Sequence, residues 1–344
     1  MLGALLFSFN LSAKRTKKQH KANAEKIMAD TLKSAVKDTS TKKDKPAFKT
    51  VKEVTDKCKK YSGLFNVYQD STTGKTYLEI NEDKIGKEYI YFAYVLDGVV
   101  DAGYARGGFK DNAVFKIERY FDRIDFTLRN TNYYFDSTNA LSKSKEANIN
   151  QPLFYSEKIA ALTIDDKSKK KTYLIDADNL FLGENFTQIK PTKQAGERAD
   201  AFTLGSLSAK KSKYLAIKNY PQNTDVAVEY VYDNPTPANN GKEEVTDARF
   251  VSVKLQHALI AVPDNNYKSR FDDPRVGYFI DKINDQTTTN AIPWRDVIHR
   301  WNLEKKNPED KLSEPKKPIV WWIENTTPKE FRPIIKNAVL AWNE

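Results

Sequence analysis

The sequence predicts a mainly β protein, in which antiparallel strands form a meander folded as a sandwich or an open barrel, with a strand–helix unit at the end of the chain. Three observations support this class. Between Tyr61 and Asp281, short apolar runs alternate with segments rich in Asn, Asp, Gly and Pro. Helical periodicity over the same range is weak and centres on Phe154–Leu162. From Pro318 onward the pattern changes to an apolar run followed by helical spacing.

The first expected strands form hairpins. Leu64–Tyr68 and Tyr77–Ile80 flank a Thr73-Gly74 turn, and Ala113–Tyr120 pairs with Arg123–Leu128 around Asp122. Further strands are expected at Tyr173–Ile175, Tyr214–Ile217, Val226–Tyr232, Phe250–Val262 and Val276–Ile280.

The run Tyr89–Leu96 has no polar face. An aromatic-rich run of this length predicts a central strand that is covered on both sides. The glycines of the following loop, Gly103, Gly107 and Gly108, lack the context of a phosphate-binding loop and indicate turns.

The last segment opens with an apolar strand, Pro318–Ile323. Thr327, Pro328 and Glu330 resemble a helix start, but Pro333 would break a helix that ran from Pro328. A short turn followed by a helix with Pro333 in its first turn is therefore expected. The tryptophans of this unit, Trp321, Trp322 and Trp342, are expected in its core.

The positive charge of the chain belongs to one segment. Lys14–Lys60 holds 16 Lys and Arg against 6 Asp and Glu, so the remaining residues hold 40 of each sign. This distribution predicts a flexible basic linker beside a neutral folded body, and it argues against a nucleic-acid partner. The apolar residues 1–13 end in small side chains and favour a signal peptide, which implies export to the periplasm, cell surface or medium. No later run is long enough for a transmembrane helix.

These shifts in composition divide the chain into six segments. They are a signal peptide (1–13), a basic flexible linker (14–60), a small β domain (61–100), a β-rich domain (101–290), a connector (291–317) and a truncated strand–helix unit (318–344).

Residues that could carry chemistry are few. Cys58 is the single cysteine, and the three histidines are His20, His257 and His299, none of them in an HExxH motif. His257 falls on the apolar face of its expected strand. This placement favours a hydrogen-bonded core histidine over a metal ligand or pH-sensitive contact. His299 is expected at the surface or an interface.

Several stretches resemble one family, the large metzincin-like zinc-dependent metalloproteases common in Bacteroidetes. They are Gly63–Tyr68, Ala102–Gly108, Arg270–Phe279, Trp301–Lys306, Leu312–Glu324, Thr327-Pro328, Phe331–Pro333 and Ala341–Asn343. The resemblance covers roughly residues 50–344. It implies that residues 318–344 are the first strand and helix of the protease domain, and that the chain ends before the zinc motif.

The resemblance implies a non-catalytic accessory or pro-region of a secreted zinc metalloendopeptidase. Its partner would be the downstream catalytic domain in cis, which would also hold the zinc, so no catalytic residue, cofactor or metal ligand is assigned to this chain. Two alternatives stay open. One is a stand-alone β-sandwich module that binds peptide or glycan at the cell surface, and the other is a decayed homologue.

The loop Asp272-Asp273-Pro274-Arg275 offers a regulatory hypothesis. A carboxylate of Asp272 or Asp273 could occupy the open coordination position of a downstream catalytic zinc and keep a zymogen inactive. Ordinary turn chemistry, with an Asp273–Arg275 salt bridge, is the simpler interpretation.

Overall fold

The structure, a computed structural model, describes residues 48–190, 192, 196 and 201–343. The chain divides into two units, Met1–Phe48 and Lys49–Glu344, and the described residues lie almost wholly in the second. The expected signal peptide and residues 14–47 of the expected linker fall outside the described residues.

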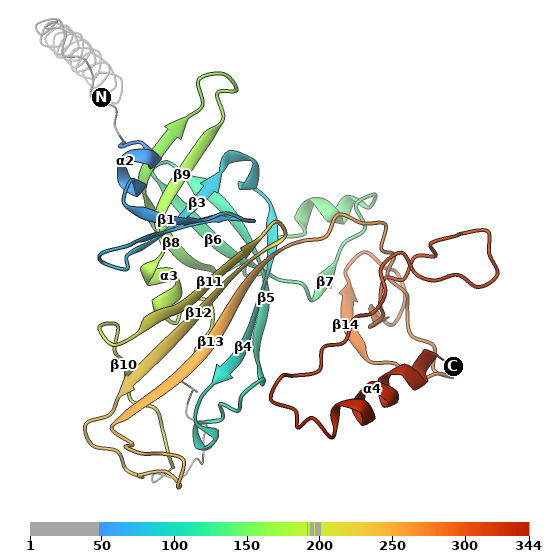
Figure 1. Cartoon of the computed structure of the whole chain (residues 1–344). Helices are drawn as coiled ribbons and strands as arrows, with labels where there is room; N and C mark the ends of the chain where they lie inside the picture. Colours follow the sequence, from blue (N-terminus) through green and yellow to red (C-terminus); the bar gives the residue numbers. More distant parts are fainter. Residues whose placement is uncertain (1–47, 191, 193–195, 197–200, 344) are drawn as a thin grey trace, which may run out of the picture. The chain divides into compact units, whose positions relative to one another are not determined.

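A large antiparallel sheet dominates the described part of the chain, where twelve strands curl into a half-barrel (Figure 1). This confirms the mainly β class and the open-barrel alternative. The strands are β1 (Cys58–Tyr61), β2 (Asn66–Asp70), β3 (Thr76–Asn81), β4 (Glu88–Asp97), β5 (Phe109–Tyr120), β6 (Arg123–Arg129), β8 (Leu153–Ile164), β9 (Lys171–Asp176), β10 (Ser206–Leu207), β11 (Lys213–Tyr220), β12 (Asn223–Asp233) and β13 (Phe250–Ala261).

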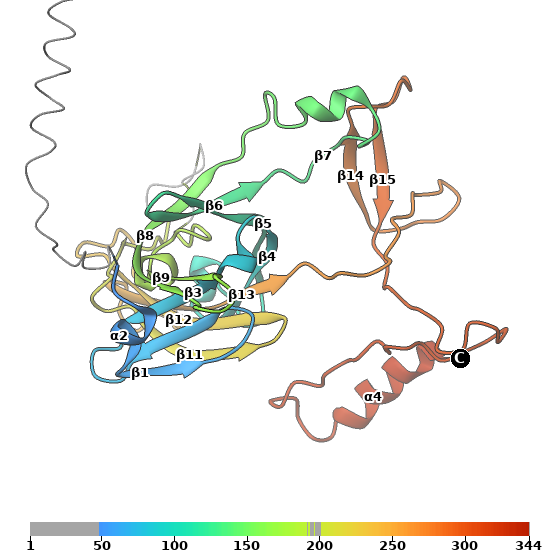
Figure 2. The same cartoon turned by 90° about the horizontal axis from the view of Figure 1, so that it is seen from above.

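The strand order is β1-β2-β3-β9-β8-β6-β5-β4-β13-β12-β10, with β11 also paired to β12. The curl brings β1, at one end of this order, close to β11, which pairs with β12 near the other end (Figure 2). At this seam the Leu64 backbone N–H donates to the Tyr220 carbonyl at 2.7 Å. The Asn219 side chain donates to the carbonyls of Tyr61 (2.8 Å) and Phe65 (2.5 Å).

The core fills the concave face of the sheet. Alternate residues of β4, β12 and β13 point into it, as the period of two in a strand requires. Helix α3 (Asp178–Leu182) and the residues that follow it lie against these strands, and their side chains Leu180, Phe181, Phe186 and Ile189 are buried. Residues 178–190 therefore act as a plug for the half-barrel.

The expectation that β4 is covered on both faces is wrong. Tyr89, Tyr91, Ala93 and Val95 are buried, but Phe92 on the opposite face is 36% exposed. The sheet is a single layer there, so the outer face has no second layer of described residues to cover it. Because the outer face of β4 also carries aromatic side chains, its sequence does not alternate between apolar and polar residues.

One boundary drawn from composition needs correction. Residues 49–60 are not linker, because they form helix α2 (Val51–Thr55) and β1. A capping box starts α2, in which Thr50 and Glu53 each hydrogen-bond the other's backbone N–H. The expected division at residues 100 and 101 runs through the sheet, since β4 pairs with β5 and β13.

The weak helical pattern at Phe154–Leu162 belongs to strand β8. A register shift between Ile159 and Ala161 interrupts the pairing with β9. The buried positions Tyr155, Ile159 and Ala161 are spaced by four and then two residues, which keeps the even spacing of a strand. The polar Glu157 at the position between Tyr155 and Ile159 interrupts the apolar alternation in the sequence.

A second, small sheet contains β7 (Tyr133–Tyr134), β14 (Ile280–Asp285) and β15 (Trp294–Ile298), which lie side by side in Figure 2. β14 pairs antiparallel with β15 and parallel with β7. The strand expected at Val276–Ile280 is wrong, because the strand begins only at Ile280. Residues 276–279 form a turn and loop, with the Val276 N–H donating to Asp273.

The last described segment contains α4 (Arg332–Leu340) and the short 3₁₀ turn Ala341–Asn343. Pro333 lies in the first turn of α4, and a separate turn precedes it, which confirms the expected helix restart. The strand expected at Pro318–Ile323 is wrong, because these residues pair with no strand in the described part of the chain. The other short helical turns are Glu82–Lys84, Val100–Ala102 and Ala140–Ser144.

Candidate functional site

His257 lies at the centre of a buried polar network. The Tyr91 hydroxyl is 2.9 Å from His257 Nδ1, and the Tyr230 hydroxyl is 2.7 Å from His257 Nε2. The Tyr230 hydroxyl also donates to the carbonyl of Phe181 in the plug, at 2.5 Å. Tyr230 has one proton to donate, so it accepts from Nε2–H, and Nδ1 accepts from Tyr91. The network thus assigns the Nε2–H tautomer and uses both ring nitrogens.

Burial also fixes the charge of His257. Its side chain is 2% exposed, and desolvation lowers its pKa to about 3, so the ring is neutral at neutral pH. Burial likewise raises the pKa of Tyr91 and Tyr230 far above their usual range. The expected hydrogen-bonded core histidine is confirmed. The network fastens strands β4, β12 and β13 to the plug.

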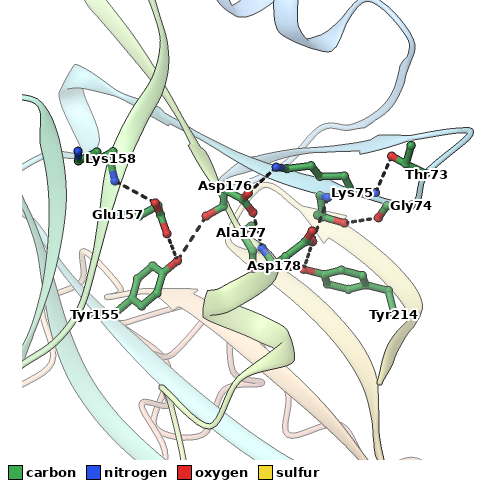
Figure 3. A network of polar contacts seen from close by, with 11 residues as sticks. Thr73, Gly74, Lys75, Tyr155, Glu157, Lys158, Asp176, Ala177, Asp178 and Tyr214 are labelled. Carbon is green, nitrogen blue, oxygen red and sulfur yellow. Dashed lines mark hydrogen bonds and ion pairs between the residues drawn. The ribbon is translucent and has the colours of Figure 1, made fainter. Parts of the chain in front are cut away.

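A second network joins the β2–β3 turn to the start of α3 (Figure 3). Asp178 Oδ1 accepts from the Thr76 N–H and from the Tyr214 hydroxyl, each at 3.1 Å. Asp176 Oδ1 accepts from the Asp178 N–H at 2.9 Å, and Asp176 Oδ2 pairs with Lys75 Nζ at 2.7 Å. Asp178 and Tyr214 come from distant parts of the sequence, and no motif marked them in advance.

Desolvation is the main cause of the electrostatic shifts in this second network. It raises the pKa of the half-buried Asp178, and it raises the pKa of the Tyr214 hydroxyl well above its usual range. A carboxyl with a raised pKa can serve as a general acid or base. In this structure, however, Asp178 Oδ1 already accepts two hydrogen bonds, and these join α3 to β3 and β11. The geometry therefore supports a structural role for Asp178.

Asp178 variants test this role. Replacing Asp178 with Ala removes the acceptor for Tyr214 and Thr76, so the free energy of unfolding at pH 7 should fall by about 1–3 kcal/mol. Asp178→Asn keeps a neutral oxygen acceptor and avoids a desolvated charge, so it should retain the wild-type stability. Urea unfolding followed by far-UV circular dichroism measures both. Equal destabilisation by the two variants would contradict this structural role of Asp178.

Asp272 and Asp273, the candidates for a regulatory role, take part in neither network. Asp273 accepts from Arg275 Nε (2.9 Å) and Nη2 (2.7 Å) and from its backbone N–H (3.0 Å). The hydrogen bonds from Arg275 lower the pKa of Asp273 below its usual range. This is the turn chemistry expected as the simpler interpretation. The backbone N–H of Asp272 donates to Asp296 at 2.8 Å.

The other candidate residues show ordinary surroundings. Cys58 is partly buried in β1, and desolvation raises its pKa, which disfavours a reactive thiolate. His299 is exposed, with Nε2 at 2.9 Å from the exposed carboxylate of Asp281, in line with a surface residue. His20 lies outside the described residues. Within the described ranges, no three His, Cys, Asp or Glu side chains are grouped to hold a metal ion.

The segment 318–343 exposes an unusual amount of apolar surface. Trp322 is 89% exposed and Trp342 92%, and Trp321 is 67% exposed. The expectation that these tryptophans form a core is wrong. Residues from 303–323, from α4 and from the 3₁₀ turn that follows it line a groove of about 620 Å3, and Trp321 and Trp342 are among them. We call residues 318–343 the C-terminal apolar surface.

Two regions of the chain match known protein families. Residues 108–306 match the family described as Domain of unknown function (DUF5117), which is more than half of the 344 residues. The chain belongs to the DUF5117 family. Residues 48–96 match a second family, Domain of unknown function (DUF5118). The DUF5117 region covers β5 to β15, and the DUF5118 region covers α2 and β1 to most of β4.

No curated protein and no solved structure matches this DUF5117 chain. Among the described residues, no helix is both long and apolar enough to cross a membrane. The C-terminal apolar surface lies beyond the DUF5117 match.

Proposed function

We propose that this chain is a non-catalytic accessory region of a secreted zinc-dependent metalloprotease, and that its C-terminal apolar surface packs against the catalytic domain. The observation that carries the proposal is the exposure of Trp322 and Trp342. Large contiguous apolar patches on soluble proteins mark interaction sites, because leaving them in water is costly. The sequence resemblance supports the choice of occupant, since it assigns residues 318–344 to the opening of a protease domain.

The state of the histidines supports an accessory role over a catalytic one. Both ring nitrogens of His257 are engaged by tyrosine hydroxyls, and His299 faces Asp281 at the surface. The sequence has no HExxH motif to place two imidazoles on one helix face. Peptide hydrolysis would therefore depend on residues supplied by the partner domain.

The first test is the native gene and its product. We expect the reading frame to continue past the codon for Glu344 into an HExxH motif with a third histidine, and the intact mass of the protein in its own cells to agree. A frame that stops at Glu344, with a matching mass, would refute the proposal.

A second test uses the double variant Trp322→Ser, Trp342→Ser. Both side chains are almost wholly exposed, so stability of the chain should stay within about 0.5 kcal/mol of wild type. Binding of a hydrophobic dye should fall by at least half, and in the protease-linked protein peptidase activity should fall. Tyr133→Ser, at an exposed position outside the surface, is the control. Unchanged activity of the protease-linked double variant would contradict the packing role.

A further inference from the structure

A groove lies on the large sheet, and none of its lining residues belongs to the C-terminal apolar surface. Its volume is about 640 Å3, which is within the usual range for small-ligand sites. Its apolar part comes from β4, β5 and β6, and its rim from the residues that follow β6 and precede β8. The lining residues are Ile90, Asn112, Ala113, Val114, Leu128, Arg129, Asn130, Thr131, Asn132, Asn150 and Pro152.

The rim of the groove is rich in unpaired amides. In the described part of the chain, the side chains of Asn112, Asn132 and Asn150 make no hydrogen bond, and all three residues are exposed. Each amide offers two N–H donors and one carbonyl acceptor. Three such groups around an apolar floor suit a ligand whose surface alternates hydroxyl groups with C–H patches.

The groove carries no free charge of its own. Its one ionic side chain, Arg129, pairs with Glu88 and with Glu146, each at 3.0 Å. The two carboxylates engage Nε and Nη2 of the guanidinium, and together the three side chains carry one positive and two negative charges. This negative balance repels an anionic ligand, so the site favours a neutral ligand.

An aromatic pair continues the groove on the outer face of the sheet. Phe92 on β4 lies directly opposite Asn112 on β5, so the two side chains share that face. Phe92 is 36% exposed and Phe109 63%, with ring centroids 5.6 Å apart. The electron-rich faces of such rings attract the polarised C–H groups of a pyranose ring.

The pairing of the strands disfavours an extended peptide. A peptide that adds to a sheet needs an unpaired strand edge. β5 is paired with both β4 and β6, so it offers no free main-chain edge in the groove. Recognition must come from side chains, and the side chains present are amides and aromatic rings.

We propose that this groove binds a neutral saccharide chain, with the amides of Asn112, Asn132 and Asn150 on its hydroxyl groups and the Phe92–Phe109 pair under a sugar ring. The proposal does not depend on the protease-linked role, because it concerns a different surface. It assigns the sheet a carbohydrate-binding activity.

The test uses the full chain and an array of neutral and acidic glycans, followed by calorimetry with the best neutral hexasaccharide. Asn112→Ala and Phe109→Ala should each weaken binding at least ten-fold, and the folded far-UV spectrum should persist because both side chains are exposed. The matched controls, Asn290→Ala and Phe279→Ala, change exposed residues outside the groove and should leave affinity unchanged.

Three results would overturn the proposal. They are the absence of neutral glycan binding on the array, a neutral glycan whose affinity is the same in the groove variants and their controls, and stronger binding by acidic than by neutral glycans. A further result is that an uncharged hexapeptide binds while no saccharide does. If that peptide shifts the amide resonances of Asn112 and Asn132, the groove binds peptide and the saccharide proposal is wrong.

Discussion

Replacing His257 with Ala is expected to destabilise the fold by about 3–5 kcal/mol. The substitution empties a fully buried position and leaves the Tyr91 and Tyr230 hydroxyls without their ring partner. Urea unfolding at pH 7, followed by the strand signal in circular dichroism, gives the free energy of unfolding. His299→Ala is the matched control, because His299 is exposed and should change stability by no more than about 0.5 kcal/mol.

The same residue should make stability depend on pH. The pKa of His257 is about 3 in the folded state, against 6.5 for an ordinary histidine, so between these values the unfolded chain binds a proton that the folded chain does not. The stability contribution is fully present above pH 6.5, and it falls by about 1.4 kcal/mol per pH unit as the pH drops toward 3.

His257→Gln isolates this effect, since glutamine can hydrogen-bond but does not titrate in this range. Carboxylates titrate in both proteins, so the difference between wild type and variant is the quantity to measure. We expect the two stability curves to converge as the pH falls from 6.5 to 3. Parallel curves over this range would show that His257 does not carry the proton linkage.

Gly63→Ala is expected to open the seam of the half-barrel and to destabilise the protein by about 3 kcal/mol. A Cβ atom at Gly63 would lie 1.9 Å from Asn219 Oδ1 and 2.7 Å from the Tyr220 backbone nitrogen. Asn219 cannot move aside freely, because its amide donates to Tyr61 and Phe65 and its oxygen accepts from Thr224.

The control for the seam is Gly277→Ala, where an added Cβ has no neighbour within 4 Å. That variant should remain within about 0.5 kcal/mol of wild type. Chemical denaturation of both proteins under the same conditions gives the comparison. Similar stability of Gly63→Ala and Gly277→Ala would mean that the contacts around Asn219 do not close the sheet.

Short sequence patterns predicted the parts of the fold that depend on interactions between residues close together in the sequence. Alternation located β12 and β13, and it also placed His257 on the buried face. The spacing of Asp273 and Arg275 predicted their ion pair, because the two residues belong to one turn. Pro333 predicted the start of α4, since it cannot lie deep inside a helix.

Features that depend on distant partners could not be predicted in this way. Pro318–Ile323 has the composition of a strand, but a strand also needs a neighbour, and the described residues supply none. Tyr214 and Asp178 are 36 residues apart in sequence, and only the curl of the sheet brings them together. The run Asn130-Thr131-Asn132 was a signal for the groove, but an Asn-rich loop is so common in turns that it could not be singled out.

The strand order bears on how the chain folds during synthesis and on whether its two family regions can be separated in the gene. Residues 48–96 supply both β1–β3 at one end of the sheet and most of β4 near its middle, and β9, β8, β6 and β5 lie between them. The DUF5118 region alone would therefore expose long unpaired strand edges, which promote aggregation. The hydrogen bond between Leu64 and Tyr220 can form only after residue 220 has been synthesised, so the seam forms late and the long-range pairing slows folding. The two family regions form one folding unit, and a genetic breakpoint between them would cut that unit in two.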